Sequence, residues 1–103
     1  MTILRILTYT PSLETARSIA AGLLDARLVA CANIGAGFES HYVWQGVREV
    51  SAETQLWLKT RLDLRAAVMA EISRLHPYEV PLIAIEEIAV NDDYAEWVAG
   101  QTS

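Results

Sequence analysis

The sequence of 103 residues has the length of one small domain, and we expect a single domain over residues 1–103. Its net charge of −5 and its scattered Lys and Arg residues give no basic face for nucleic acid, and no apolar run is long enough to span a membrane. A polar first stretch without signal-peptide character and a single cysteine, Cys31, which excludes an internal disulfide, predict a cytoplasmic protein.

The first part of the chain predicts a strand, a helix and a second strand. Branched apolar and aromatic residues fill 3–9, and the letters TPS at 10–12 supply a capping hydroxyl and a proline suited to a first helical turn. Apolar residues then recur at three- and four-residue spacing over 13–27, which predicts an amphipathic helix. The run LVACANI at 28–34 predicts a strand, with a bend or bulge at the glycines of 35–37.

A long hairpin is predicted over 38–60. The helical period disappears there, and Gly46 can take the positive φ of a tight turn between two β stretches. Trp57 lies on the less apolar side of the second stretch, where residue types alternate. Such a face is seldom left in water, and the chain as a whole is 52% apolar, so we expect part of this surface to be covered in an assembly.

The last part predicts a helix, a strand and a short terminal helix. A second amphipathic pattern begins near Asp63 and is ended by Pro77, a strand follows at 82–88, and acidic residues open a helix at 92–98. The order β-α-β-β-α-β with a terminal helix defines an α+β, ferredoxin-like split βαβ fold with two helices on one sheet face. The other face and the hairpin edges then need shielding by charge, by the terminal helix or by another subunit.

The connector LHPYEVP places His76, Tyr78 and Glu79 between two prolines. Each proline fixes its own φ and favours extended backbone at the residue before it, so the segment is stiff. It is interpreted either as a helix stop followed by a strand start, or as a binding or catalytic loop. His76 with Glu79 can form an acid–base pair, but no nucleophile motif or phosphate loop accompanies it, so the sequence does not predict an enzyme.

Other polar residues offer further candidates for binding. Cys31, His41 and His76 lack the close spacing of a metal site, so a metal held by one chain is not expected, although symmetric association can gather copies of one ligand. Lys59 and Arg61, between a strand end and a helix start, can receive an anion or can simply be solvated charges.

Five stretches of the sequence resemble one known family. They are ARLVACANI at 26–34, SHYVWQG at 40–46, LKT at 58–60, HPYEVP at 76–81 and DYAEWV at 93–98. In order and spacing they are similar to the CutA divalent-cation tolerance family, over nearly the whole chain. The resemblance implies a cytoplasmic homotrimer of ferredoxin-like subunits, built like the PII signalling proteins, with long hairpins that extend each other's sheets. It also implies a metal-binding or small-ligand-sensing protein more than an enzyme.

The chain departs from the copper-associated pattern of some members of that family. The pattern has a cysteine in the first strand and a histidine pair before Pro-Tyr, whereas this chain has Thr8 and Tyr9 near the first position and Leu75 before His76. This departure argues against soft, copper-type coordination.

The resulting prediction is a trimeric divalent-cation tolerance or metal-response protein of the metal-binding or signalling type. Its ligand-binding residues are predicted to be Lys59, His76, Tyr78 and Glu79, and a weakly bound divalent copper or zinc ion would use His76 with Cys31. No cofactor is required. The alternatives are a PII-like sensor of an anionic small metabolite and a small hydrolase that uses His76.

Overall fold

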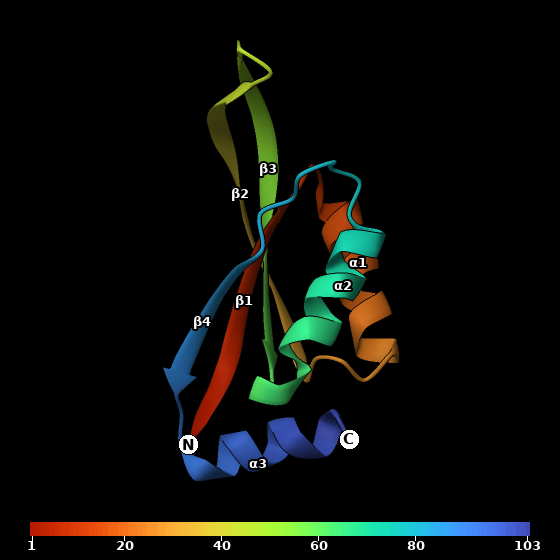
Figure 1. Cartoon of the computed structure of the whole chain (residues 1–103), viewed down its shortest axis with the longest axis vertical. Coiled ribbons are helices and arrows are strands. Elements are labelled where there is room, and N and C mark those ends of the chain that lie inside the picture. The colour runs from red at the N-terminus through yellow and green to blue at the C-terminus, as the bar shows by residue number, and fades with distance from the viewer.

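A computed structural model describes residues 1–103 and contains four strands, three α-helices and one short 3-10 turn (Figure 1). In chain order they are β1 (Thr2–Thr10), α1 (Leu13–Asp25), β2 (Cys31–Trp44), β3 (Val47–Thr60), the 3-10 turn (Leu62–Leu64), α2 (Arg65–Leu75), β4 (Ala84–Ala89) and α3 (Asp92–Gln101). This order confirms the predicted α+β arrangement. None of the helices has both the length and the apolar character that a membrane crossing requires.

The four strands form one antiparallel sheet in the order β2-β3-β1-β4, and α1 and α2 lie together on one of its faces (Figure 1). Alternate residues of the central strands point into this helix layer, as the two-residue period of a strand requires. The largest side chains of the main core are Leu4, Ile6, Leu56 and Leu58 from the sheet, with Ile19, Leu23, Val68 and Ile72 from the helices. This core fixes the sheet that carries the hairpin.

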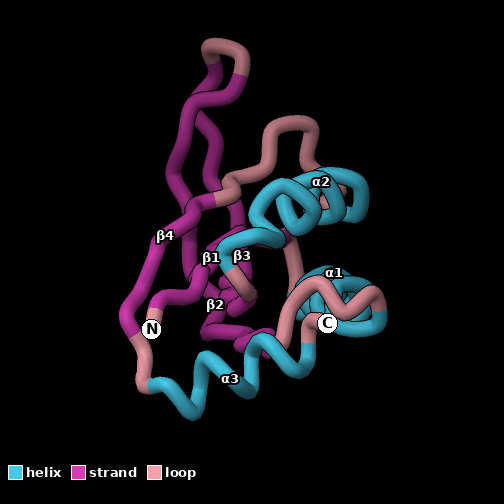
Figure 2. The backbone as a smooth tube through the Cα atoms, turned by 60° about the horizontal axis from the view of Figure 1, so that its bottom comes forward, coloured by secondary structure: helices cyan, strands magenta, loops and turns pink.

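The opposite face of the sheet is covered at only one end. There α3 packs Ala95 and Val98 against Ile3 of β1, whose side chain points away from the α1–α2 layer because the neighbouring Leu4 points into it. Figure 2 shows α3 crossing this end of the sheet, with its C-terminal end near α1. Further along the same face Arg5 lies 4.8 Å from the centre of the Trp57 ring, and both side chains are half-buried. The terminal helix α3 therefore shields part of the sheet face that α1 and α2 do not cover, and the remainder of that face is uncovered in a single chain.

Strands β2 and β3 form the long hairpin that the sequence predicts. Gln45 and Gly46 take positive φ values of 50° and 80° in a two-residue turn, which is the backbone geometry that tight hairpins favour. The hairpin projects beyond the rest of the molecule (Figure 1), and the whole chain, hairpin included, measures 45 × 24 × 23 Å. Its outer half exposes Val43, Val47 and Val50 to solvent.

Several element ends differ from the predictions. The first helix ends at Asp25, because Arg27 takes a positive φ of 58° and turns the chain away from the helix axis. The second strand consequently begins three residues later than predicted, at Cys31. Strand β4 begins at Ala84, two residues later than predicted, because the stiff connector continues up to the point where β4 first pairs with β1.

Candidate functional site

The connector that follows α2 holds a buried histidine. His76 has an extended backbone because Pro77 follows it, and the residue is only 7% exposed. Its Nε2 lies 2.8 Å from the backbone oxygen of Tyr9, and its Nδ1 accepts the backbone N–H of Tyr78 at 3.2 Å. A carbonyl only accepts and an amide N–H only donates, so the ring is neutral with its proton on Nε2. Burial lowers the pKa of His76, although the bond to the Tyr9 carbonyl opposes this shift.

Two residues further on, the connector is bound to the hairpin. The Tyr78 hydroxyl donates a hydrogen bond of 2.8 Å to Oε2 of Glu53, a residue of β3 that is only 8% exposed. None of the ion pairs in the structure includes the Glu53 carboxylate. Burial, together with the bond to this carboxylate, raises the pKa of Tyr78, so its hydroxyl stays protonated and remains a donor. Glu53 is therefore a buried acid with one neutral partner.

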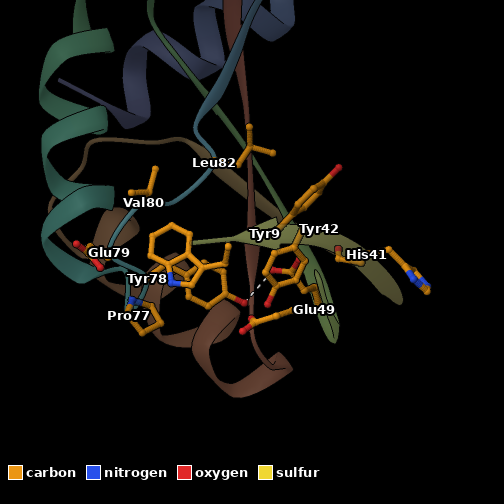
Figure 3. A pocket seen from close by; sticks show the side chains of 12 residues that line it. Tyr9, His41, Tyr42, Glu49, Pro77, Tyr78, Glu79, Val80 and Leu82 are labelled. Carbon is orange, nitrogen blue, oxygen red and sulfur yellow. Dashed lines mark hydrogen bonds between the residues drawn. The ribbon is translucent and has the colours of Figure 1, made fainter. Parts of the chain in front are cut away.

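A cavity of about 670 Å³ opens between the connector, the end of β1 and the hairpin. It is lined by the aromatic residues Tyr9, Tyr42, Trp44 and Tyr78, by the acids Glu49, Glu53 and Glu79, and by Ser40, His41, Pro77, Val80 and Leu82. No Lys or Arg lines it. Figure 3 shows Tyr42 and Tyr78 near the centre, whereas His41 and Glu79 point away from it. The volume lies within the usual range for small-ligand sites, and aromatic faces beside carboxylates suit a positively charged ligand.

A second polar group lies elsewhere on the sheet. Lys59 and Cys31 are paired across β3 and β2, where the Lys59 Nζ is 2.9 Å from Oδ1 of Asn33 and 3.9 Å from the Cys31 Sγ. Lys59 also pairs with Arg5 of β1, four residues before Tyr9 at the cavity, which corresponds to about 13 Å along the strand. This group and the cavity are therefore separate.

The predicted site residues accordingly fall into two places. His76, Tyr78 and Glu79 lie together on the connector, but only Tyr78 reaches the centre of the cavity (Figure 3). His76 is buried beside the cavity with both ring nitrogens bonded, and Glu79 points outward. Lys59 and Cys31 form the second place.

Glu53 is one of several cavity residues that the sequence analysis missed, and the one that binds the connector. It shares a sheet face with Gln55 and Trp57, because alternate residues of β3 point to the same side. The alternation noted at Trp57, continued toward the N-terminus of the strand, brings a carboxylate onto the aromatic face. This acidic residue on an otherwise aromatic strand face was the sequence signal that could have indicated the cavity.

The fold and the cavity define a ferredoxin-like α+β domain with a projecting hairpin and a small-ligand-sized pocket at the hairpin's base. A family model described as the CutA1 divalent ion tolerance protein matches residues 4–101. The chain therefore belongs to the CutA1 divalent ion tolerance family, as its motifs predict.

Curated relatives support the same assignment. The divalent-cation tolerance protein CutA of Pyrococcus horikoshii is 40% identical over 100 residues, covering 94% of this chain and 97% of that protein. The chloroplastic protein CutA 1 of rice, Oryza sativa, is 36% identical over 93 residues, covering 89% of this chain and 52% of that protein.

Solved structures share the fold over almost the whole chain. The CutA1 divalent ion tolerance protein of Ehrlichia chaffeensis has a TM-score of 0.93 at 35% identity, covering 98% of this chain and 95% of that one. A CutA from Archaeoglobus fulgidus, described as a periplasmic divalent cation tolerance protein, has a TM-score of 0.91 at 32% identity and full coverage of both chains.

Proposed function

We propose that the chain serves divalent-cation tolerance as a homotrimeric binding protein of the signalling type, and that the cavity at the base of the hairpin is its ligand site. The observation that carries this proposal is Glu53, a buried carboxylate that no cation neutralises, set in a cavity without Lys or Arg. A carboxylate in such surroundings favours a positively charged ligand, because burial of an unpaired charge is costly.

Uncovered surface supports the trimer. Strand β2 is an edge of the sheet with one side unpaired over its length, and long edges of this kind invite pairing with another chain. Exposed Val43, Val47 and Val50 on the hairpin and the half-buried Trp57 add apolar area that a neighbouring subunit can bury. Three copies that extend each other's sheets would cover both features.

Direct binding of copper or zinc is proposed to be weak. No group of three or more His, Cys, Asp or Glu side chains is arranged to hold a metal ion. His76 can join a metal only by giving up the bond to the Tyr9 carbonyl or the bond from the Tyr78 N–H. Cys31 lies beside the positive charge of Lys59, which would oppose a cation there.

The two alternative functions receive less support from the cavity. An anionic metabolite would meet carboxylates without a Lys or Arg from this chain. A hydrolase needs a free basic nitrogen, but the unprotonated Nδ1 of His76 already accepts the Tyr78 N–H. A cytoplasmic location stays a prediction. The words chloroplastic and periplasmic describe two of the relatives and not this chain.

Growth under metal stress tests whether the cavity serves this function. We would express the chain in a bacterium that lacks its own family member and measure growth in raised Cu²⁺ or Zn²⁺. The wild type and the control Glu87→Gln, which changes an exposed acid of β4, should restore tolerance. Glu53→Gln should restore much less at equal protein level. Full restoration by Glu53→Gln would show that tolerance does not depend on this cavity.

A further inference from the structure

The cavity contains an anion whose electrostatic partner is missing from the chain. Glu53 as a residue is 8% exposed, its Oε2 accepts the Tyr78 hydroxyl, and no basic side chain lies within ion-pair distance of its carboxylate. A neutral hydroxyl offsets only part of the cost of moving a carboxylate out of water. A ligand that brings positive charge to Glu53 would therefore gain more than the same ligand gains at an exposed acid.

The aromatic lining narrows the kind of cation. Tyr9, Tyr42, Trp44 and Tyr78 line the same cavity as Glu53. The hydroxyls of Tyr42 and Tyr78 are already bonded, to Ser51 at 2.9 Å and to Glu53 at 2.8 Å, so these rings chiefly offer their faces to a ligand. Aromatic faces attract organic cations, and a planar, weakly hydrated group also stacks on them.

A bare metal ion fits this lining poorly. It needs several oxygen, nitrogen or sulfur ligands at short distances, and no group of three such side chains is arranged for one. A guanidinium group is different, because it forms two parallel hydrogen bonds with one carboxylate while its flat face contacts a ring.

We propose that the cavity binds a small organic molecule through a guanidinium group, which pairs with Glu53 and stacks among the surrounding tyrosine and tryptophan rings. This inference rests on the proposed function, because it names the class of ligand for the same cavity. In this proposal the guanidinium group belongs to a free small molecule. An arginine of a second copy of the chain could supply the same group, and the experiment below distinguishes the two sources.

Calorimetry with two matched probes tests the proposal on the full-length assembled protein. The 1-butylguanidinium ion and neutral 1-butylurea have nearly the same shape, so their difference reports the charge. The guanidinium probe should bind saturably and at least about tenfold more tightly than the urea probe. Absence of saturable binding up to the solubility of the probe would overturn the proposal. This is the result expected if an arginine of a neighbouring subunit already fills the cavity. Equal binding of the two probes would overturn it as well.

Three variants locate the binding. Glu53→Gln keeps the shape of the side chain and removes its charge, and it should weaken the guanidinium probe at least about tenfold. Tyr78→Phe keeps the ring and releases the carboxylate from its donor, and it should change the affinity less than Glu53→Gln does. The control Glu87→Gln, which lowers the net negative charge of the chain equally but lies on β4, should bind within about twofold of the wild type. Undiminished binding by Glu53→Gln would overturn the proposal.

A second measurement keeps the test decisive if Glu53→Gln folds poorly. Amide and indole NMR signals of the wild type should shift on titration at Trp44, Tyr42 and Tyr78, and those of Lys59 and Cys31 should not. Shifts confined to the latter pair would overturn the proposal. Failure of guanidinium binding, with metal tolerance still dependent on Glu53, would reject the ligand class alone. Tolerance independent of Glu53 would reject the proposed function of the cavity.

Discussion

Removal of the Tyr78 hydroxyl measures how strongly the connector is bound to the hairpin. Tyr78→Phe leaves the carboxylate of Glu53, a residue that is 8% exposed, without its 2.8 Å hydrogen bond. Hydrogen bonds to charged groups contribute about 1.5–3 kcal/mol. Tyr78 is itself only partly buried, so water can replace some of the lost bond, and we expect the lower end, about 1.5 kcal/mol less free energy of unfolding per protomer.

A double-mutant cycle gives the assay for this value. Denaturant unfolding of the wild type, Tyr78→Phe, Glu53→Ala and the double variant should be measured at one protomer concentration, because association contributes to the stability of an oligomer. In the Glu53→Ala background Tyr78→Phe should cost almost nothing. The matched control Tyr42→Phe, whose hydroxyl bonds Ser51 on the exposed hairpin, should cost about 0.5 kcal/mol or less. An undiminished cost of Tyr78→Phe without Glu53 would refute the reasoning.

Three other outcomes concern assembly, pH and metal. Light scattering at micromolar protomer concentration should give three times the mass of one chain, and Trp57→Glu should split or unfold the assembly by placing a carboxylate in a dry contact; a folded wild-type monomer would contradict this. Because burial lowers the pKa of His76, the unfolded chain protonates first, near its ordinary value of about 6.5, so this contribution to stability is present above that pH and falls as the pH drops toward the folded pKa. Unfolding at about pH 7.5 and about pH 5.5 should show this loss in the wild type and in the control His41→Gln, and a smaller one in His76→Gln; equal losses in all three would argue against it. By calorimetry, zinc should bind in the micromolar range or more weakly, with lower affinity at the lower pH and several-fold lower affinity in His76→Ala. Nanomolar binding that is unchanged in His76→Ala would show that other ligands hold the ion.

Local signals in the sequence predicted the elements well, because they act over a few residues. Ser12 caps α1 by accepting the backbone N–H of Thr15 at 3.1 Å, so the capping hydroxyl predicted from the TPS letters is confirmed, whereas Pro11 precedes the cap and does not lie in the first turn. Gly46 takes the positive φ expected of the hairpin turn. Arg27 was misassigned to the helix because nothing in its neighbours indicates a positive φ at a residue other than glycine.

The site was harder to predict because its residues meet through strand pairing. The register of β2 against β3 shifts between Ile34 and Gly37, so the residues of β2 that share a face change from odd to even numbers along the strand. Cys31 and Tyr42 can therefore lie on one sheet face although their spacing of eleven indicates opposite faces. Glu53 and Tyr78 are 25 residues apart, and no local pattern announces that a hydroxyl and a carboxylate meet across that separation.

Two hydrogen bonds hold the connector, one to the core and one to the hairpin, so the width of the cavity depends on the angle of the hairpin. The bond between His76 Nε2 and the backbone oxygen of Tyr9 joins the connector to the end of β1, which belongs to the core. The bond from the Tyr78 hydroxyl to Glu53 joins it to β3 at the point where that strand leaves the core. About six residues of β3, or roughly 20 Å, separate Glu53 from the turn, so a tilt of about 10° at the base would move the tip of the hairpin by roughly 3.5 Å. A molecule bound between the two walls of the cavity would restrict this tilt, so occupancy at the base of the hairpin would limit the movement of its tip.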